Sequence, residues 1–66
     1  MEIIVNGEAR QIPDHCSVAE LVAAMNLTGR RIAVEINLDI VPRSTYETRR
    51  LQAGDRVEIV HAIGGG

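Results

Sequence analysis

The sequence predicts an α+β fold in which a small sheet packs on one helix, and three observations predict it. Residues 2–5 and 32–36 are rich in β-branched side chains, as strands are. Residues 18–25 carry apolar side chains at helical spacing. The 66 residues leave room for one domain only, and its hydrophobic fraction of 45% is that of a chain with a packed core.

A hairpin opens the chain. Residues 2–5 predict a strand, and Asn6-Gly7 is a strong signal for a tight hairpin turn. A second strand is then expected over residues 8–12. Its register stays open, because a two-residue loop places Val5 opposite Glu8, whereas a three-residue loop shifts that pairing by one residue, to Ala9.

The predicted helix begins at a capping box. The Ser17 hydroxyl can accept a hydrogen bond from the Glu20 amide, while the Glu20 carboxylate can accept one from the Ser17 amide. Asn26 and Gly29 tolerate the left-handed geometry that ends a helix. Between these signals, one apolar stripe recurs at i, i+3, i+4 and i+7: Val18, Leu21, Val22 and Met25.

Two further strands follow the helix. Residues 32–36 alternate apolar side chains with Ala33 and Glu35, the period of a strand with one buried face. Residues 37–39 are expected to turn. Ile40-Val41 then forms a very short strand that stops at Pro42, which cannot donate to a ladder.

The last strand completes the sheet. Polar residues 44–50 predict a single helical turn or a loop, and Leu51 is expected to anchor it in the core. A turn at residues 53–55 leads into a strand over residues 56–63, in which Val57 and Ile59 point inward.

These elements follow one another in the order β-β-α-β-β-β. They predict a mixed sheet of four to five strands packed on one helix, with the first and last strands side by side, as in the ubiquitin-like β-grasp fold. We expect residues 1–63 to form this domain and residues 64–66 to form a flexible glycine tail.

Composition narrows the function. Tyr46 is the single aromatic residue and the net charge is −2, which argues against nucleic-acid binding. All seven basic residues are arginine, so lysine-based chemistry is excluded. Cys16 is the single cysteine, and the chain contains neither an export signal nor an apolar run of membrane-spanning length. We therefore expect a cytoplasmic protein without a membrane partner.

Conventional catalytic constellations are hard to build from this chain. His15, Cys16 and Ser17 are neighbours in sequence, so their side chains are not expected to meet as a nucleophile and its base. A metal site from His15, Cys16 and His61 would need a fourth ligand. We expect no catalytic residue, no metal and no bound cofactor, and interpret the protein as not an enzyme. Arg30-Arg31 and Arg49-Arg50 are expected to be solvated, or else to dock an acidic partner.

The glycine run is the most informative feature. Gly64, Gly65 and Gly66 follow an apolar strand directly and can extend about 10 Å beyond it. A stem without side chains can enter a narrow slot and carry a carboxylate into it. A frayed terminus would have the same composition, but the direct junction with the strand favours a functional tail.

Several stretches, taken in order and at this chain length, resemble the ThiS-type sulfur carriers of thiamine biosynthesis. Tyr46 lies where an aromatic residue is common in that family. The other stretches that carry the resemblance are Met1 to Gly7, Val18 to Leu21, Ile32 to Asn37, Ile40 to Arg43, Leu51 to Val60, and Gly65-Gly66.

The resemblance implies a mechanism. A ThiF-like adenylyltransferase would consume ATP to convert the Gly66 carboxylate into an acyl-adenylate. Sulfur from a donor such as a cysteine desulfurase would replace AMP and leave a thiocarboxylate at Gly66. A ThiG-like thiazole synthase would then take that sulfur for the thiazole ring.

Partner recognition is expected on the sheet face opposite the helix. If alternation holds, Ile4, Val60 and Ala62 point outward, and neighbouring first and last strands would join them into one apolar patch beside the tail. Three alternatives remain: a molybdopterin-type thiocarboxylate carrier, a non-covalent ubiquitin-like interaction domain, and an enzyme that uses Cys16.

Overall fold

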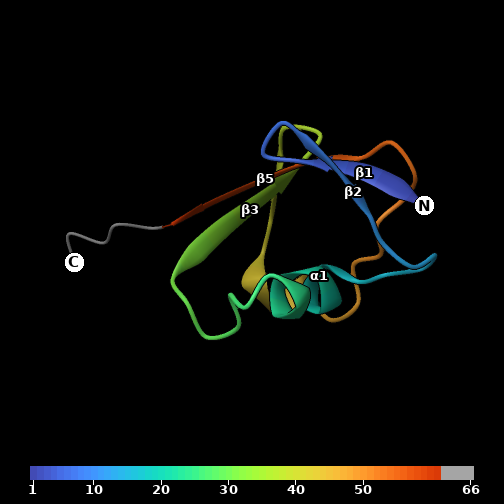
Figure 1. Cartoon of the computed structure of the whole chain (residues 1–66). Helices are drawn as coiled ribbons and strands as arrows, with labels where there is room; N and C mark the ends of the chain where they lie inside the picture. The colour runs from blue at the N-terminus through green and yellow to red at the C-terminus, as the bar shows by residue number, and fades with distance from the viewer. Residues whose placement is uncertain (62–66) are drawn as a thin grey trace.

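A computed structural model describes residues 1–61 of the chain (Figure 1). One five-stranded mixed sheet, in the order β2-β1-β5-β3-β4, packs on a single α-helix. The α+β class, the order of elements and the side-by-side first and last strands are confirmed. The elements are β1 (Glu2–Val5), β2 (Glu8–Gln11), α1 (Val18–Ala24), β3 (Ile32–Ile36), β4 (Asp39–Val41), a 3₁₀ turn (Arg43–Thr45) and β5 (Arg56–His61).

The first hairpin has a two-residue loop. Asn6 and Gly7 both have positive φ, 50° and 84°, as in a type I′ turn. Val5 therefore pairs with Glu8, which settles the register. The second strand ends at Gln11, one residue earlier than predicted, and the buried Ile12 donates its amide to the Met1 carbonyl at 2.9 Å.

Helix α1 begins at the predicted capping box. The Glu20 amide donates to Ser17 Oγ at 3.1 Å, and the Ser17 amide donates to Glu20 Oε1 at 2.8 Å. Asn26 and Gly29 adopt positive φ after the helix, as expected. The start of α1 is also tied to the segment before β5, because the Leu51 amide donates to the Cys16 carbonyl at 2.8 Å.

The second hairpin is tighter than predicted. Asn37 and Leu38 alone form its loop, with φ of 52° and 74°, and Asp39 already pairs with Ile36. The expected turn over residues 37–39 and strand start at Ile40 are therefore wrong by one residue. Residue propensity does not predict this turn, because Leu38 occupies a left-handed position where glycine is usual.

Strand β5 lies in the middle of the sheet. It runs parallel to β1, with Val5 opposite Val57, and antiparallel to β3, with Ile32 opposite His61. Its predicted extension to residue 63, the domain boundary there and the glycine tail lie outside the described residues.

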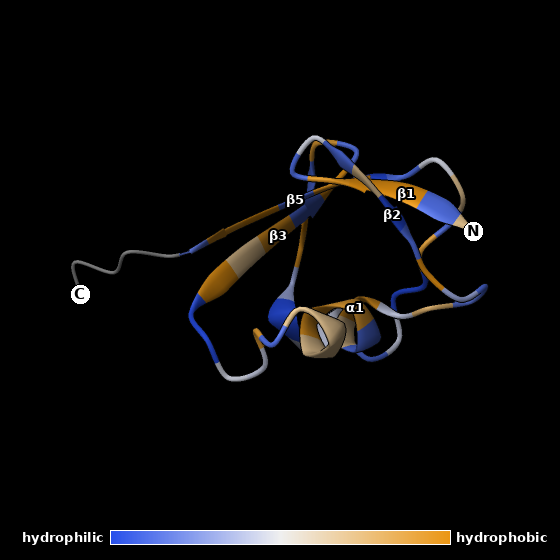
Figure 2. Cartoon of the chain, in the orientation of Figure 1, coloured by the Kyte–Doolittle hydropathy of each residue, from blue (hydrophilic) through white to orange (hydrophobic). Residues whose placement is uncertain are grey.

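The core lies between the sheet and α1. In Figure 2 the hydrophobic colour gathers on β1, β3, β5 and part of α1, whereas β2 is mostly hydrophilic. Leu51 is buried as predicted, as are the inward-facing Val57 and Ile59. The most deeply buried side chains are Ile3, Val18, Leu21, Val34, Ile36 and Val57.

Candidate functional site

The end of β5 is the place from which a tail would leave the domain. Strand β1 ends at Val5, level with Val57, so the last part of β5 continues beside β3 alone (Figure 1). His61 is the last described residue of that strand. The predicted site residues Ala62, Gly64, Gly65 and Gly66 lie outside the described residues.

Ile4 and Val60 both lie on the sheet face that α1 leaves open, as alternation predicts. Ile3 and Val5 are buried on the other face, while Ile4 is half-buried and Val60 is 56% exposed. Their side chains are therefore available from the same side of the sheet.

These two residues are not adjacent on that face. The parallel register places Ile4 opposite Arg56, and Val60 lies four residues further along β5. That separation is about 13 Å along a strand. Val60 instead lies opposite the exposed Ala33 of β3, because β1 has ended. The register thus separates Ile4 from Val60, while Ala62, the third member of the expected patch, lies outside the described residues.

Cys16 has the environment of a core residue rather than of a nucleophile. It is 6% exposed, and its thiol donates to the Ser17 carbonyl oxygen at 3.4 Å. Burial, with a further contribution from the Glu20 carboxylate, raises the pKa of the Cys16 thiol, while Arg50 opposes this. A raised pKa suppresses the thiolate, which is the reactive form.

The histidines do not gather with Cys16 into a metal site. His15 precedes Cys16 in the loop before α1, and His61 ends β5. Within residues 1–61, no three His, Cys, Asp or Glu side chains lie close enough together to hold an ion. The helix found in this range is also too short to cross a membrane.

The two arginine pairs occupy different places. Arg50 is engaged locally, donating to the His15 carbonyl at 3.1 Å and lying 3.7 Å from the Glu20 carboxylate. Arg30 and Arg31 are exposed just before β3, whose first residue is paired with His61. Arg30 and Arg31 therefore lie at the end of the sheet where the described part of β5 ends.

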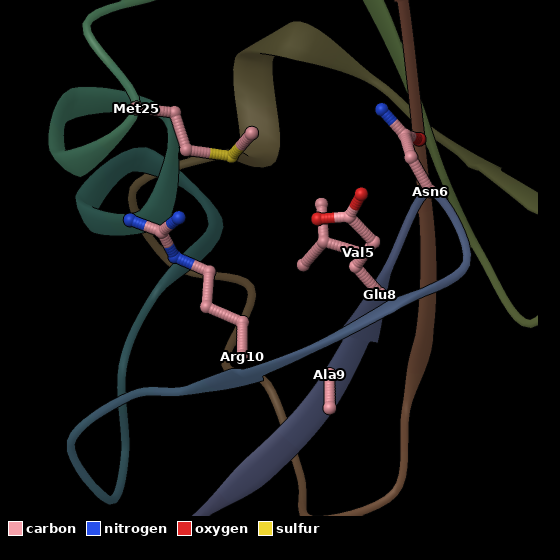
Figure 3. Close-up of a pocket in the computed structure, with 6 residues that line it drawn as sticks. All are labelled: Val5, Asn6, Glu8, Ala9, Arg10 and Met25. Atoms are coloured by element: carbon pink, nitrogen blue, oxygen red, sulfur yellow. The ribbon is translucent and has the colours of Figure 1, made fainter.

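A shallow hollow of about 250 Å³ lies between the first hairpin and the end of α1 (Figure 3). The side chains of Val5, Glu8, Arg10 and Met25 line it, together with Asn6 and Ala9. This hollow is smaller than the sites that small ligands usually occupy, so it does not indicate a substrate pocket.

One residue near the tail exit was missed by sequence reasoning. Asn6 was interpreted only as a turn former, yet its side-chain amide bonds both backbone groups of Ile59 in β5. The Asn-Gly pair was the available signal, but nothing local indicates a partner 53 residues away.

Comparison with known proteins identifies the family of this chain. The model of the ThiS family matches residues 3–66, which is nearly the whole chain. The chain belongs to the ThiS family. The sequence-based resemblance to ThiS-type proteins is thereby confirmed, together with the ubiquitin-like β-grasp fold.

Individual members and relatives of the ThiS family agree with this assignment. The sulfur carrier protein ThiS of Escherichia coli is 32% identical over 66 residues, covering 100% of both chains. A crystal structure of the thiamine biosynthesis protein ThiS from Geobacter metallireducens superposes with a TM-score of 0.87 at 28% identity, again over 100% of both chains.

A second kind of relative is longer. A thiazole synthase of Paramagnetospirillum magneticum is 41% identical over 66 residues, which is 100% of this chain but 20% of that protein. A thiazole synthase of Magnetococcus marinus matches in the same way at 36% identity. The chain thus spans about a fifth of the length of these relatives. In both of them, a ThiS-like stretch is part of a thiazole synthase chain.

Proposed function

We propose that this protein is a sulfur carrier of thiamine biosynthesis and that it acts as a co-substrate of its partner enzymes. The observation that carries the proposal is the ThiS family match, which continues through the glycine run to residue 66. The full-length similarity to a sulfur carrier protein ThiS supports it. The raised pKa and burial of Cys16 argue against the alternative of a cysteine enzyme.

The chemistry is centred on the Gly66 carboxylate. A carboxylate is a poor electrophile, so a ThiF-like adenylyltransferase first uses ATP to form an acyl-adenylate at Gly66, with loss of pyrophosphate. The persulfide of a donor such as a cysteine desulfurase then attacks the acyl-adenylate and displaces AMP, which gives an acyl disulfide. A thiol cleaves this acyl disulfide, so that the donor leaves as a disulfide with that thiol and a thiocarboxylate remains at Gly66. Glycine suits the attack on the acyl-adenylate because no side chain obstructs the carbonyl carbon that is attacked.

Thiazole synthase is the proposed acceptor of the sulfur. The support is that two thiazole synthases contain a stretch similar to this chain over all 66 residues. Two functions joined in one polypeptide act at high effective concentration, which suits a carrier and the enzyme that it supplies. The molybdopterin-type pathway gains no comparable support.

The open face of the sheet is the proposed docking surface for these partners. Val60 is its best candidate residue, because it is exposed and lies one residue before the end of the described part of β5. Ala62 is proposed to extend this surface toward the tail. Ile4 remains a proposed contact, though one separated from Val60 by the register of β5.

The requirement for a free Gly66 carboxylate tests the proposal. We expect a variant with one alanine added after Gly66 to lose thiocarboxylate formation in a reaction with a ThiF-like adenylyltransferase, ATP and a sulfur donor. The unextended protein is the control. Equal thiocarboxylate formation by both proteins would contradict the requirement for Gly66 as the terminal residue. Equal binding of the partner enzymes by both, with a thiocarboxylate on neither, would favour a non-covalent interaction domain.

A further inference from the structure

Asn6 makes an unusual set of contacts with β5. Its backbone amide donates to the Val57 carbonyl at 2.8 Å, as the next rung of the parallel ladder. Its side-chain Nδ2 donates to the Ile59 carbonyl at 3.1 Å, and its Oδ1 accepts from the Ile59 amide at 2.8 Å. Figure 3 shows the Asn6 amide directed away from Val5 and along the neighbouring strand.

These contacts continue β1 beyond its last residue. The carbonyls of Asp55 and Val57 accept from the backbone of Ile4 and Asn6, so alternate residues of β5 face β1. Ile59 is the next residue on that edge, but the chain of β1 has already turned away at Gly7. A side-chain amide offers one acceptor and a donor, as a peptide group does, so Asn6 replaces the missing rung.

Asn37 provides a natural comparison at the opposite end of β5. It too occupies the first position of a two-residue loop, with φ of 52° against 50° for Asn6. Its Oδ1 accepts from the Arg56 amide at 3.0 Å, and its Nδ2 donates to Asp55 Oδ1 at 3.1 Å. The two asparagines thus bind β5 near its two ends, Asn37 at Arg56 and Asn6 at Ile59.

We infer that Asn6 is a positioning residue for chemistry at the glycine run, acting through Ile59. The inference rests on the sulfur-carrier function proposed above. Beyond Val57, β5 has backbone pairing on its β3 side, and the Asn6 amide supplies the bonds on the other side. Holding Ile59 restrains β5 on this side, two residues before the end of its pairing with β3. A partner that must place Gly66 accurately then has less chain to order on binding.

Asn6→Gly is the test variant and Asn37→Gly its matched control. Glycine keeps the positive φ of both loops, so each substitution removes the side-chain amide without straining the turn. Three quantities are compared in wild type and both variants: the free energy of unfolding in urea, the exchange rate of the Ile59 amide by NMR, and the KM and kcat of a ThiF-like adenylyltransferase for the carrier. Asn6→Asp, which keeps the acceptor for the Ile59 amide, serves if Asn6→Gly does not fold.

We expect both glycine variants to lose stability to a similar extent. Only Asn6→Gly should accelerate exchange of the Ile59 amide by more than the loss of global stability explains, and only Asn6→Gly should raise KM. Each effect is expected to be roughly tenfold, which is equivalent to about 1.4 kcal/mol, the net contribution of one hydrogen bond. The kcat should stay near the wild-type value, because the carboxylate itself is unchanged.

Equal KM values for the two glycine variants would overturn the inference, as would unchanged Ile59 exchange in Asn6→Gly. An inactive wild-type protein would instead count against the proposed function, and the exchange measurement would still decide whether Asn6 holds the end of β5.

Discussion

The Glu20 carboxylate shows how one residue makes the stability of the helix depend on pH. Hydrogen bonds from the backbone and side chain of Ser17, and the nearby Arg50 guanidinium, lower the pKa of Glu20. A carboxyl group whose pKa is lowered by folding stabilises the fold above its unfolded pKa. That contribution is lost as the pH falls through the folded value.

We therefore expect wild type to be more stable than Glu20→Gln at pH 7 and to lose that advantage below about pH 4, near the ordinary pKa of glutamate. Glutamine keeps an acceptor for the Ser17 amide but has no charge to titrate. Urea unfolding of both proteins from pH 7 to pH 3 measures the difference. A difference that stays constant over this range would contradict the role of the charge.

Cys16→Ala separates packing from catalysis. The side chain is 6% exposed, so we expect the substitution to lower the free energy of unfolding by about 1 kcal/mol, the usual cost of one buried heavy atom. The rate of sulfur loading should not change. Thermal unfolding measures the change in stability, and a loading assay measures the rate of sulfur loading. A folded variant that no longer loads sulfur would contradict this account and would make Cys16 a functional residue.

Residues that act locally were predictable from the sequence, and residues that act at a distance were not. The capping box of Ser17 and Glu20 needs a spacing of three residues, and it forms as predicted. The bonds between Asn6 and Ile59 need a parallel pairing of the first and last strands in one register. Side-chain propensity carries no information about that register.

At the scale of elements, the second hairpin contains a correctable defect. Leu38 is 87% exposed and has φ of 74°, a left-handed conformation that costs a non-glycine residue about 1–2 kcal/mol. The equivalent position of the first hairpin is Gly7, with φ of 84°. The β3–β4 connection is thus the same turn with a less suitable residue.

Leu38→Gly is expected to stabilise the protein by about 0.5–1 kcal/mol, because the relief of backbone strain exceeds the greater freedom of glycine in the unfolded chain. Gly7→Leu is the converse control and should destabilise by at least as much. Chemical unfolding measures both. A less stable Leu38→Gly protein would show that the exposed leucine contributes contacts that outweigh its strain.

The same hairpin shows why element boundaries were predicted less well than element types. The strand over residues 32–36 was predicted with its correct ends, since its alternation is regular. The start of β4 was misplaced by one residue, because Leu38 and Asp39 do not distinguish a two-residue from a three-residue loop by composition. The position of the turn follows from pairing with Ile36, which is a tertiary contact.

At the scale of the whole molecule, Val60 tests the proposed docking surface. Val60→Glu adds a charge to an exposed position, so we expect the domain to fold normally and to lose at least about tenfold in affinity for the adenylyltransferase and for thiazole synthase. Leu38→Glu is the control, because Leu38 is also exposed but lies beyond the other end of the β3–β5 pairing. Calorimetric titration measures the affinities.

Retained affinity in Val60→Glu, or an equal loss in Leu38→Glu, would contradict docking beside the tail. The sequence predicted which face Val60 occupies but not its neighbours. Alternation along a strand determines the face, whereas the neighbours depend on where β1 ends relative to β5.

The proposed sulfur-carrier role is tested most directly by the intact mass of the protein after incubation with a ThiF-like adenylyltransferase, ATP and a sulfur source. A sample without ATP is the control. The predicted result is an ATP-dependent gain equal to the replacement of one oxygen by sulfur, located in the fragment that contains Gly66. An unchanged mass with an adenylyltransferase shown to be active on another carrier would contradict it.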